Sequence, residues 1–131
     1  MELVGGIMPK IKETSHQQQF LSWCERHTFY TSHSEYDPSK KYTGCVFSVP
    51  NGGLRKAIDM VMLKREGLLT GASDVVVMLP HKVVFMEFKT DSGKQSQKQK
   101  DFQAVCRVLG LEYYLVWSSF EAVGLVKEWI C

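Results

Sequence analysis

The sequence predicts an α/β fold in which a central mixed β-sheet is flanked by helices, in the order α-β-α-β-β-α-β-α. Two continuous apolar runs, hinged at Pro80-His81, predict a pair of neighbouring strands. Four segments with helical periodicity and two further short β-type runs share the rest of the chain. Helices and strands that alternate in this way favour a layered α/β sandwich.

The N-terminal half predicts two helices and one strand. A helix is expected over 15–26, with Gln17 on its apolar face, and a strand over 45–49 that runs into a Pro-Asn-Gly-Gly turn. A second helix is expected over 54–66 and ends at Gly67. The apolar residues that define the two helical faces are Phe20, Leu21 and Cys24 in the first, and Leu54, Ala57, Ile58, Val61 and Met62 in the second.

The C-terminal half predicts three strands and two helices. The runs 74–79 and 82–88 contain few polar residues, which is typical of strands that helices bury on both faces. Ser96-x-x-Gln99 forms a capping box for the next helix, which Gly110 ends. Its expected buried stripe is Phe102, Cys106 and Leu109, and it is followed by the strand 112–117 and a closing helix capped by Ser118 or Ser119.

Length and composition indicate one domain, spanning 1–131. A hydrophobic fraction of 44% and a charged fraction of 23% are ordinary for a soluble globular protein. No apolar run approaches the roughly 20 residues that cross a bilayer, and the first residues lack the features of a secretory signal. We therefore expect a cytoplasmic protein without a membrane partner.

Four cysteines are spread along the chain without a CxxC pair, so disulfides are not expected. One spacing offers four possible zinc ligands, but the usual paired ligands are missing, and this interpretation is not favoured. The residues concerned are Cys24, His27, His33 and Cys45.

The apolar hairpin places two acids opposite each other. Facing residues of an antiparallel pair have numbers with a constant sum, and a loop at Pro80-His81 pairs Leu79 with Lys82 and Asp74 with Glu87. Directly opposite residues have Cβ atoms about 4.5 to 5.5 Å apart, and like charges there are destabilising. Side chains alternate along a strand, so Lys89 shares the face of Glu87.

Two carboxylates in this position suit a hard divalent cation such as Mg²⁺, which would relieve their repulsion. Such an ion supplies a Lewis acid and an activated water for phosphodiester cleavage, and Lys89 would neutralise developing charge. A plain salt-bridge cluster at the sheet edge explains the same three residues without catalysis. Gln99 fits its capping role, and its spacing to Phe102 also places it on the inward face of the helix.

Net charge is only +2, so bulk electrostatics neither require nor exclude a nucleic-acid partner. Cations are clustered locally, although solvated helix faces explain each pair taken singly. The clusters are Lys40-Lys41, Arg55-Lys56, Lys64-Arg65 and the trio Lys94, Lys98 and Lys100.

Taken together, "GASD", "MEFK" and "SQKQ" resemble the PD-(D/E)XK nuclease superfamily, and specifically its virus-type replication-repair nuclease (VRR-NUC) branch. The segment "PNGGLRKAIDMVMLKREGLLTGASD" is similar to the glycine-rich run of phage members, and "LGLEYYLVWSSFEAV" to their ending. The resemblance covers about 13–130 and implies a restriction-endonuclease-like sandwich. Ser73 replaces the proline of the superfamily motif, which leaves the carboxylate ligand unchanged.

The resemblance implies a metal-dependent, structure-specific endonuclease that uses Mg²⁺ or Mn²⁺. It assigns Asp74 and Glu87 as catalytic metal ligands, the backbone carbonyl of Phe88 as a third ligand, Lys89 as the catalytic lysine and Gln99 as the helix glutamine. Glu13, four residues before Gln17, fits the acid and glutamine of the family's first helix. DNA contacts are expected at Asn51, Arg55, Lys56, Lys94 and Lys98.

Phage members of the family resemble homodimeric resolvases of four-way junctions, so branched or junction DNA and a second copy of the chain are the expected partners. The expected setting is a bacterial or phage-infected host cell. Two alternatives stay open: a nucleic-acid-binding module of the same fold that does not cleave, and a small α/β protein-interaction domain. Either the dimer surface or plain core explains Val123, Val126 and Trp129-Ile130 of the closing helix, and Phe29, Tyr30 and Tyr36 of the aromatic linker.

Overall fold

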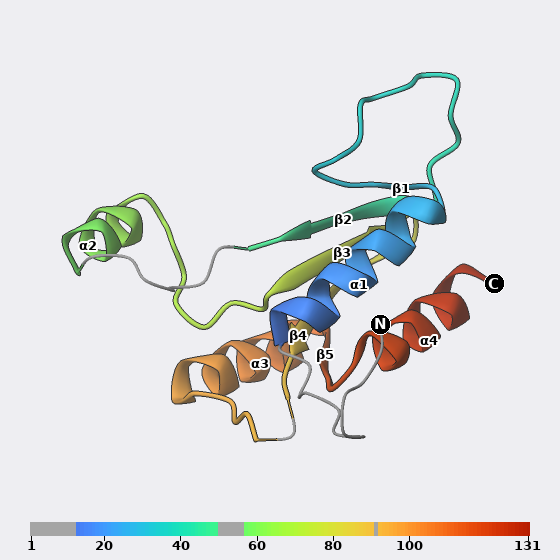
Figure 1. Ribbon diagram of the computed structural model, residues 1–131. Coiled ribbons are helices and arrows are strands. Elements are labelled where there is room, and N and C mark those ends of the chain that lie inside the picture. Colours follow the sequence, from blue (N-terminus) through green and yellow to red (C-terminus); the bar gives the residue numbers. More distant parts are fainter. Residues whose placement is uncertain (1–12, 50–56, 91) are drawn as a thin grey trace, which may run out of the picture.

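The computed structural model describes residues 13–49, 57–90 and 92–131, without the side chains of residues 13, 14 and 57–60. Helices and strands alternate around a mixed sheet, so the predicted α/β class is confirmed (Figure 1). The elements are α1 (Glu13–Arg26), β1 (Phe29–Tyr30), β2 (Gly44–Ser48), α2 (Ala57–Arg65), β3 (Val75–Leu79), β4 (Lys82–Phe88), α3 (Gln97–Leu109), β5 (Glu112–Val116) and α4 (Ser119–Ile130).

The sheet has the strand order β1-β2-β3-β4-β5. The outer pairs, β1 with β2 and β4 with β5, are parallel, while β3 is antiparallel to both of its neighbours. The sequence interpretation missed β1, which is only two residues long, and it recognised antiparallel pairing only in the β3–β4 hairpin. The pairing of β2 with β3 is an addition to it.

The hairpin register follows the constant sum predicted from the turn. Leu79 pairs with Lys82, and Val75 pairs with Met86. Alternation then divides the side chains between two faces of the sheet. Val75 and Met86 lie on one face, and the next pair outward, Asp74 with Glu87, belongs to the other.

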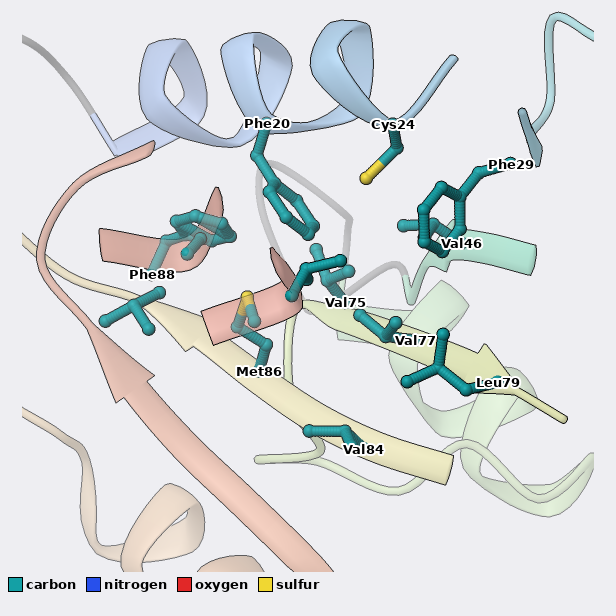
Figure 2. Packing of buried hydrophobic residues seen from close by; sticks show 13 residues of the cluster. Phe20, Cys24, Phe29, Val46, Val75, Val77, Leu79, Val84, Met86 and Phe88 are labelled. Carbon is teal, nitrogen blue, oxygen red and sulfur yellow. The ribbon is translucent and has the colours of Figure 1, made fainter. Parts of the chain in front are cut away.

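The first face carries the hydrophobic core, which α1 and α4 cover. Phe20 and Cys24 of α1 point toward the strands, and the ring of Phe20 lies 5.7 Å from that of Phe88 (Figure 2). Burying an aromatic or aliphatic side chain of this size contributes about 1.5 to 3 kcal/mol. Ala122 and Val126 of α4 complete this layer. Val126 and Phe29 are fully enclosed here, so these two residues are core and not dimer surface.

The opposite face is covered only in part. The ring of Phe102 in α3 packs edge-on against Phe85, with 5.4 Å between centroids. Toward β2, however, Met78 is 43% exposed and Val83 is 38% exposed, and Phe47 lies beside them with similar exposure. The expectation that helices bury both faces of the hairpin is therefore wrong for this half of the sheet.

Both ends of α3 lie where the sequence predicts them, but the apolar stripe of this helix is not buried along its whole length. Ser96 is the N-cap in a complete capping box, and Gly110 closes the helix in the left-handed conformation. Cys106 is buried as predicted, whereas Leu109 is 65% exposed, so the predicted stripe does not continue into the last turn. In α2, which lies apart from the other layers (Figure 1), Val61 and Met62 of the predicted apolar face are also half-exposed.

The cysteine and histidine residues of the zinc interpretation lie in different environments. Cys24 is enclosed in the core, where burial raises the pKa of its thiol to about 12 and keeps it protonated. His33 instead contacts Glu25, with 2.6 Å between Nδ1 and Oε1.

Within the described ranges, no helix is both long and apolar enough to span a membrane.

Candidate functional site

The candidate site lies where the β3–β4 hairpin opens. Asp74 stands immediately before β3, and Glu87 is the last but one residue of β4. Asp74 is tied to β4 because its Oδ2 accepts a hydrogen bond from the backbone N–H of Phe88 at 3.0 Å. This bond to the side chain lies one position beyond the last paired residues of the hairpin, and it holds the aspartate carboxylate beside Glu87.

Glu87 is the centre of the site. It is only 1% exposed, although it is a carboxylic acid on an apolar strand. Its Oε2 accepts a hydrogen bond from Gln99 Nε2 at 3.0 Å and lies 3.9 Å from Lys89 Nζ. Its Oε1 is buried, and no donor group among the described residues contacts it. A buried oxygen without a donor is costly, because it has lost water and gained nothing in return.

The ionisation of Glu87 is strongly perturbed by its surroundings. Burial, together with hydrogen bonding to and repulsion from Asp74, raises the pKa of Glu87 to about 9, while Lys89 acts in the opposite direction. At neutral pH the pair therefore holds a proton when nothing else neutralises it. Either this proton or a divalent cation would neutralise negative charge on the two carboxylates, so proton and cation compete for the site.

Gln99 performs both of the roles weighed from the sequence. Its Oε1 accepts a hydrogen bond from the backbone N–H of Ser96 at 2.9 Å, which completes the capping box. Its Nε2 is directed to Glu87 from the same side chain. The start of α3 and the orientation of the Glu87 carboxylate are thus fixed by one residue.

The donor set fits a hard divalent ion. Asp74 and Glu87 supply carboxylate oxygens, and Oε1 of Glu87 receives no hydrogen bond from a donor within the described ranges. The N–H of Phe88 points toward Asp74, and in an extended strand the carbonyl of the same residue faces the same neighbour. Mg²⁺ is commonly held by one or two carboxylates, with water and phosphate completing its octahedron. Among the described residues no group of three or more His, Cys, Asp or Glu is placed to bind a metal.

The remaining predicted residues lie on α1, on α3 and the loop before it, or outside the described part. Gln17 is partly buried one turn before Phe20 on the face of α1 that packs on the sheet, and Lys94 and Lys98 are exposed. The side chain of Glu13 is not described. Asn51, Arg55 and Lys56 lie outside the described residues.

A polar network beside the acids was missed from the sequence. Gln95 donates from Nε2 to Gln103 Oε1 at 3.0 Å and to the Tyr113 hydroxyl at 3.2 Å. Burial raises the pKa of Tyr113 to about 12, and the negative charges of Glu87 and Asp74 add to the effect. The alternation of "EYYLV" was the available signal, since it places Tyr113 on the sheet face of Phe85 and Glu87.

Gly71 is a second residue whose role the sequence did not reveal. It has φ +90, and a Cβ at this position would lie 2.4 Å from the carbonyl carbon of Lys98 in α3. Only glycine permits this close approach of two backbones. The loop that leads into Asp74 is therefore seated directly on the first turn of α3.

The comparisons with known proteins bear on the fold. No protein-family model matches the sequence, and a search of curated proteins finds no match. Among solved structures, a protein described as a "VRR_NUC domain protein" superposes with a TM-score of 0.66 at 13% sequence identity, covering 92% of this chain and 89% of that one. The resemblance predicted from the motifs is thus confirmed at the level of structure: the chain has the fold of a VRR_NUC domain protein.

Proposed function

We propose that the chain is a metal-dependent DNA endonuclease that cleaves phosphodiester bonds in branched DNA, in the manner of a Holliday-junction resolvase. The observation that carries the proposal is the pair of carboxylates itself: Glu87 is buried beside Asp74, and no donor in the described part of the chain contacts its Oε1. The fold shared with a VRR_NUC domain protein supports the same activity.

The roles follow from the contacts. Asp74, Glu87 and the carbonyl of Phe88 would hold Mg²⁺ or Mn²⁺, which when bound supplies a Lewis acid and a water of lowered pKa. Gln99 holds the Glu87 carboxylate in one orientation through its Nε2. Lys89, almost enclosed beside Glu87, presents an ammonium group to charge that develops on the phosphate. Lys94 and Lys98 are exposed and would contact the DNA backbone.

The test is a cleavage assay with Mg²⁺ or Mn²⁺ on four-way junction, flap, splayed and linear duplex DNA. We expect metal-dependent cutting of the branched substrates, and a loss of at least about a hundredfold in Asp74→Asn and Lys89→Gln, because each removes a group of the reaction centre. Glu112→Gln, which removes an outlying carboxylate paired with Lys82, serves as the matched control and keeps full activity. Undiminished cutting by Asp74→Asn would refute the metal site.

A second measurement separates the nuclease from a module that binds DNA without cutting and from a protein-interaction domain. Thermal unfolding with and without Mn²⁺ should show stabilisation in the wild type, by about 2.7 kcal/mol at a hundredfold excess over Kd, and none in Asp74→Asn. DNA affinity should also fall steeply as salt rises. A chain with neither metal stabilisation nor salt-dependent DNA binding is the interaction domain.

We also propose that the protein acts as a homodimer, because two symmetric sites suit the two strands of a junction. The exposed half of the sheet, formed by Phe47, Met78 and Val83, supplies an apolar surface for it. Of the surfaces predicted from the sequence, Val126 and Phe29 belong to the core, whereas Tyr30, Tyr36 and Ile130 are exposed.

A further inference from the structure

A cavity of about 390 Å³ lies near the candidate site and is lined by residues of α2, of the loop before Gly71, and of α3. Its apolar lining comes from Leu68 and Leu69 of the loop and from Phe102 and Val105 of α3. Its volume lies in the range of about 300 to 1,000 Å³ typical of sites for small organic groups. None of the residues that line it belongs to the metal centre.

Two lysines and one aspartate are the charged residues in the described part of the chain that line this cavity. Lys64 from α2 and Lys98 from α3 both line it. Asp101 also lines it, held by Gln97, which donates from Nε2 to Asp101 Oδ1 at 2.9 Å. The apolar lining and the two ammonium groups suit a ligand that places a flat apolar group inside the cavity and its phosphates outside. The carboxylate is an acceptor suited to the amino group of a base, and it would repel a phosphate.

Two connections place the cavity beside the reaction centre. Lys98 lines it and is followed directly by Gln99, which binds Glu87. Thr70 lines it and is followed by Gly71, which is seated on Lys98 and leads within three residues to Asp74. The cavity and the metal centre therefore share the first turn of α3 and the same loop.

We propose that this cavity receives the base of an unpaired nucleotide next to the phosphate that is cut. The inference rests on the proposed nuclease function and narrows its substrate to DNA with an unpaired or splayed nucleotide at the branch. The ring of Phe102, fixed against Phe85 and Tyr113, supplies an aromatic contact for the base. Lys64 and Lys98 take the flanking phosphates.

The test uses a splayed-arm DNA with 2-aminopurine at the first unpaired position, and a blunt duplex with the same probe in its interior. Val105→Trp and Leu69→Trp fill the cavity from two sides, and both side chains are partly exposed, so the larger ring is accommodated. Val108→Trp is the matched control, because Val108 lies on the same helix, is 84% exposed and does not line the cavity. Binding is measured in an Asp74→Asn background to prevent cleavage, and circular dichroism checks that each variant is folded.

We expect the wild-type cavity to bind the splayed DNA about tenfold more tightly than the duplex, and to change the probe emission only at the unpaired position. Both cavity-filling variants should lose this preference, and Val108→Trp should retain it. Equal behaviour of Val105→Trp, Leu69→Trp and Val108→Trp would overturn the proposal. Failure of the nuclease proposal is recognised separately, as absence of metal-dependent cutting by the chain with Asp74 intact.

Discussion

At the scale of single residues, the site depends on side chains that each satisfy two demands. Gln99 caps α3 through Oε1 and orients Glu87 through Nε2. Asp74 accepts from the backbone of β4 and faces Glu87. Because one side chain serves both structure and chemistry, neighbouring substitutions can separate the two contributions.

Ser96→Ala and Gln99→Ala form such a pair. Each breaks the capping box, so each should reduce the free energy of unfolding by about 1 kcal/mol. Only Gln99→Ala also removes the contact to Glu87, and it should lower metal affinity or kcat by roughly 10- to 100-fold. Urea unfolding and Mn²⁺ titration of both variants test this. An equal loss of metal affinity in Ser96→Ala would show that the cap alone matters.

Much of the residue-level site could be predicted from the sequence. The turn at Pro80-His81 fixes the hairpin register, and the spacing of Ser96 and Gln99 marks the capping box. Tyr113 and Gly71 could not be assigned so directly. The contact of Tyr113 with Gln95 and the approach of Gly71 to Lys98 exist only once separate segments are packed together.

At the scale of elements, periodicity predicted where helices and strands lie more reliably than it predicted which of their side chains are buried. Leu109 continues the periodic stripe of α3, yet its side chain is exposed, because periodicity gives the spacing of apolar residues and not what packs against each of them. Met78 and Val83 lie in continuous apolar runs, yet α3 covers only the side of the sheet nearer to β5. The two-residue β1 is too short to give a pattern and is held by its pairing with β2.

The contact between the loop and α3 gives a prediction at this scale. Gly71→Ala should destabilise the protein by more than Gly67→Ala. Both residues have positive φ, which costs an alanine roughly 1 to 2 kcal/mol, but only Gly71 meets backbone atoms of α3. Gly71→Ala should also reduce cleavage, because it displaces Asp74 from Glu87. Chemical unfolding and activity of the two variants are compared, and equal stabilities would contradict the close contact.

At the scale of the whole molecule, the two faces of the sheet are unequal. One is sealed by α1 and α4, which are also joined by a hydrogen bond from Ser119 Oγ to Gln19 Oε1 at 2.7 Å. The other holds the acids and the cavity at one end and exposes apolar side chains at the other. Sequence could not predict this asymmetry, since it depends on where α2 and α3 lie relative to the strands.

The exposed end leads to a prediction for assembly. Met78→Lys should weaken the proposed homodimer at least tenfold, because an ammonium group would lose water in an apolar interface. Val61→Lys, a similar change on the separate helix α2, should leave it intact. Sedimentation equilibrium of both variants distinguishes them. A dimer unaffected by Met78→Lys would place the interface on another surface.

The close contact of Gly71 with Lys98 has one more consequence, which concerns how the binding of one ligand affects the affinity for another. Gln99 follows Lys98 without a break, so a ligand that shifts the first turn of α3 changes how firmly Glu87 is held. Thermodynamic reciprocity then requires that cation binding alter the affinity for that ligand by the same factor. If the cavity and the two acids bind their ligands as proposed, this backbone contact would therefore couple the two affinities.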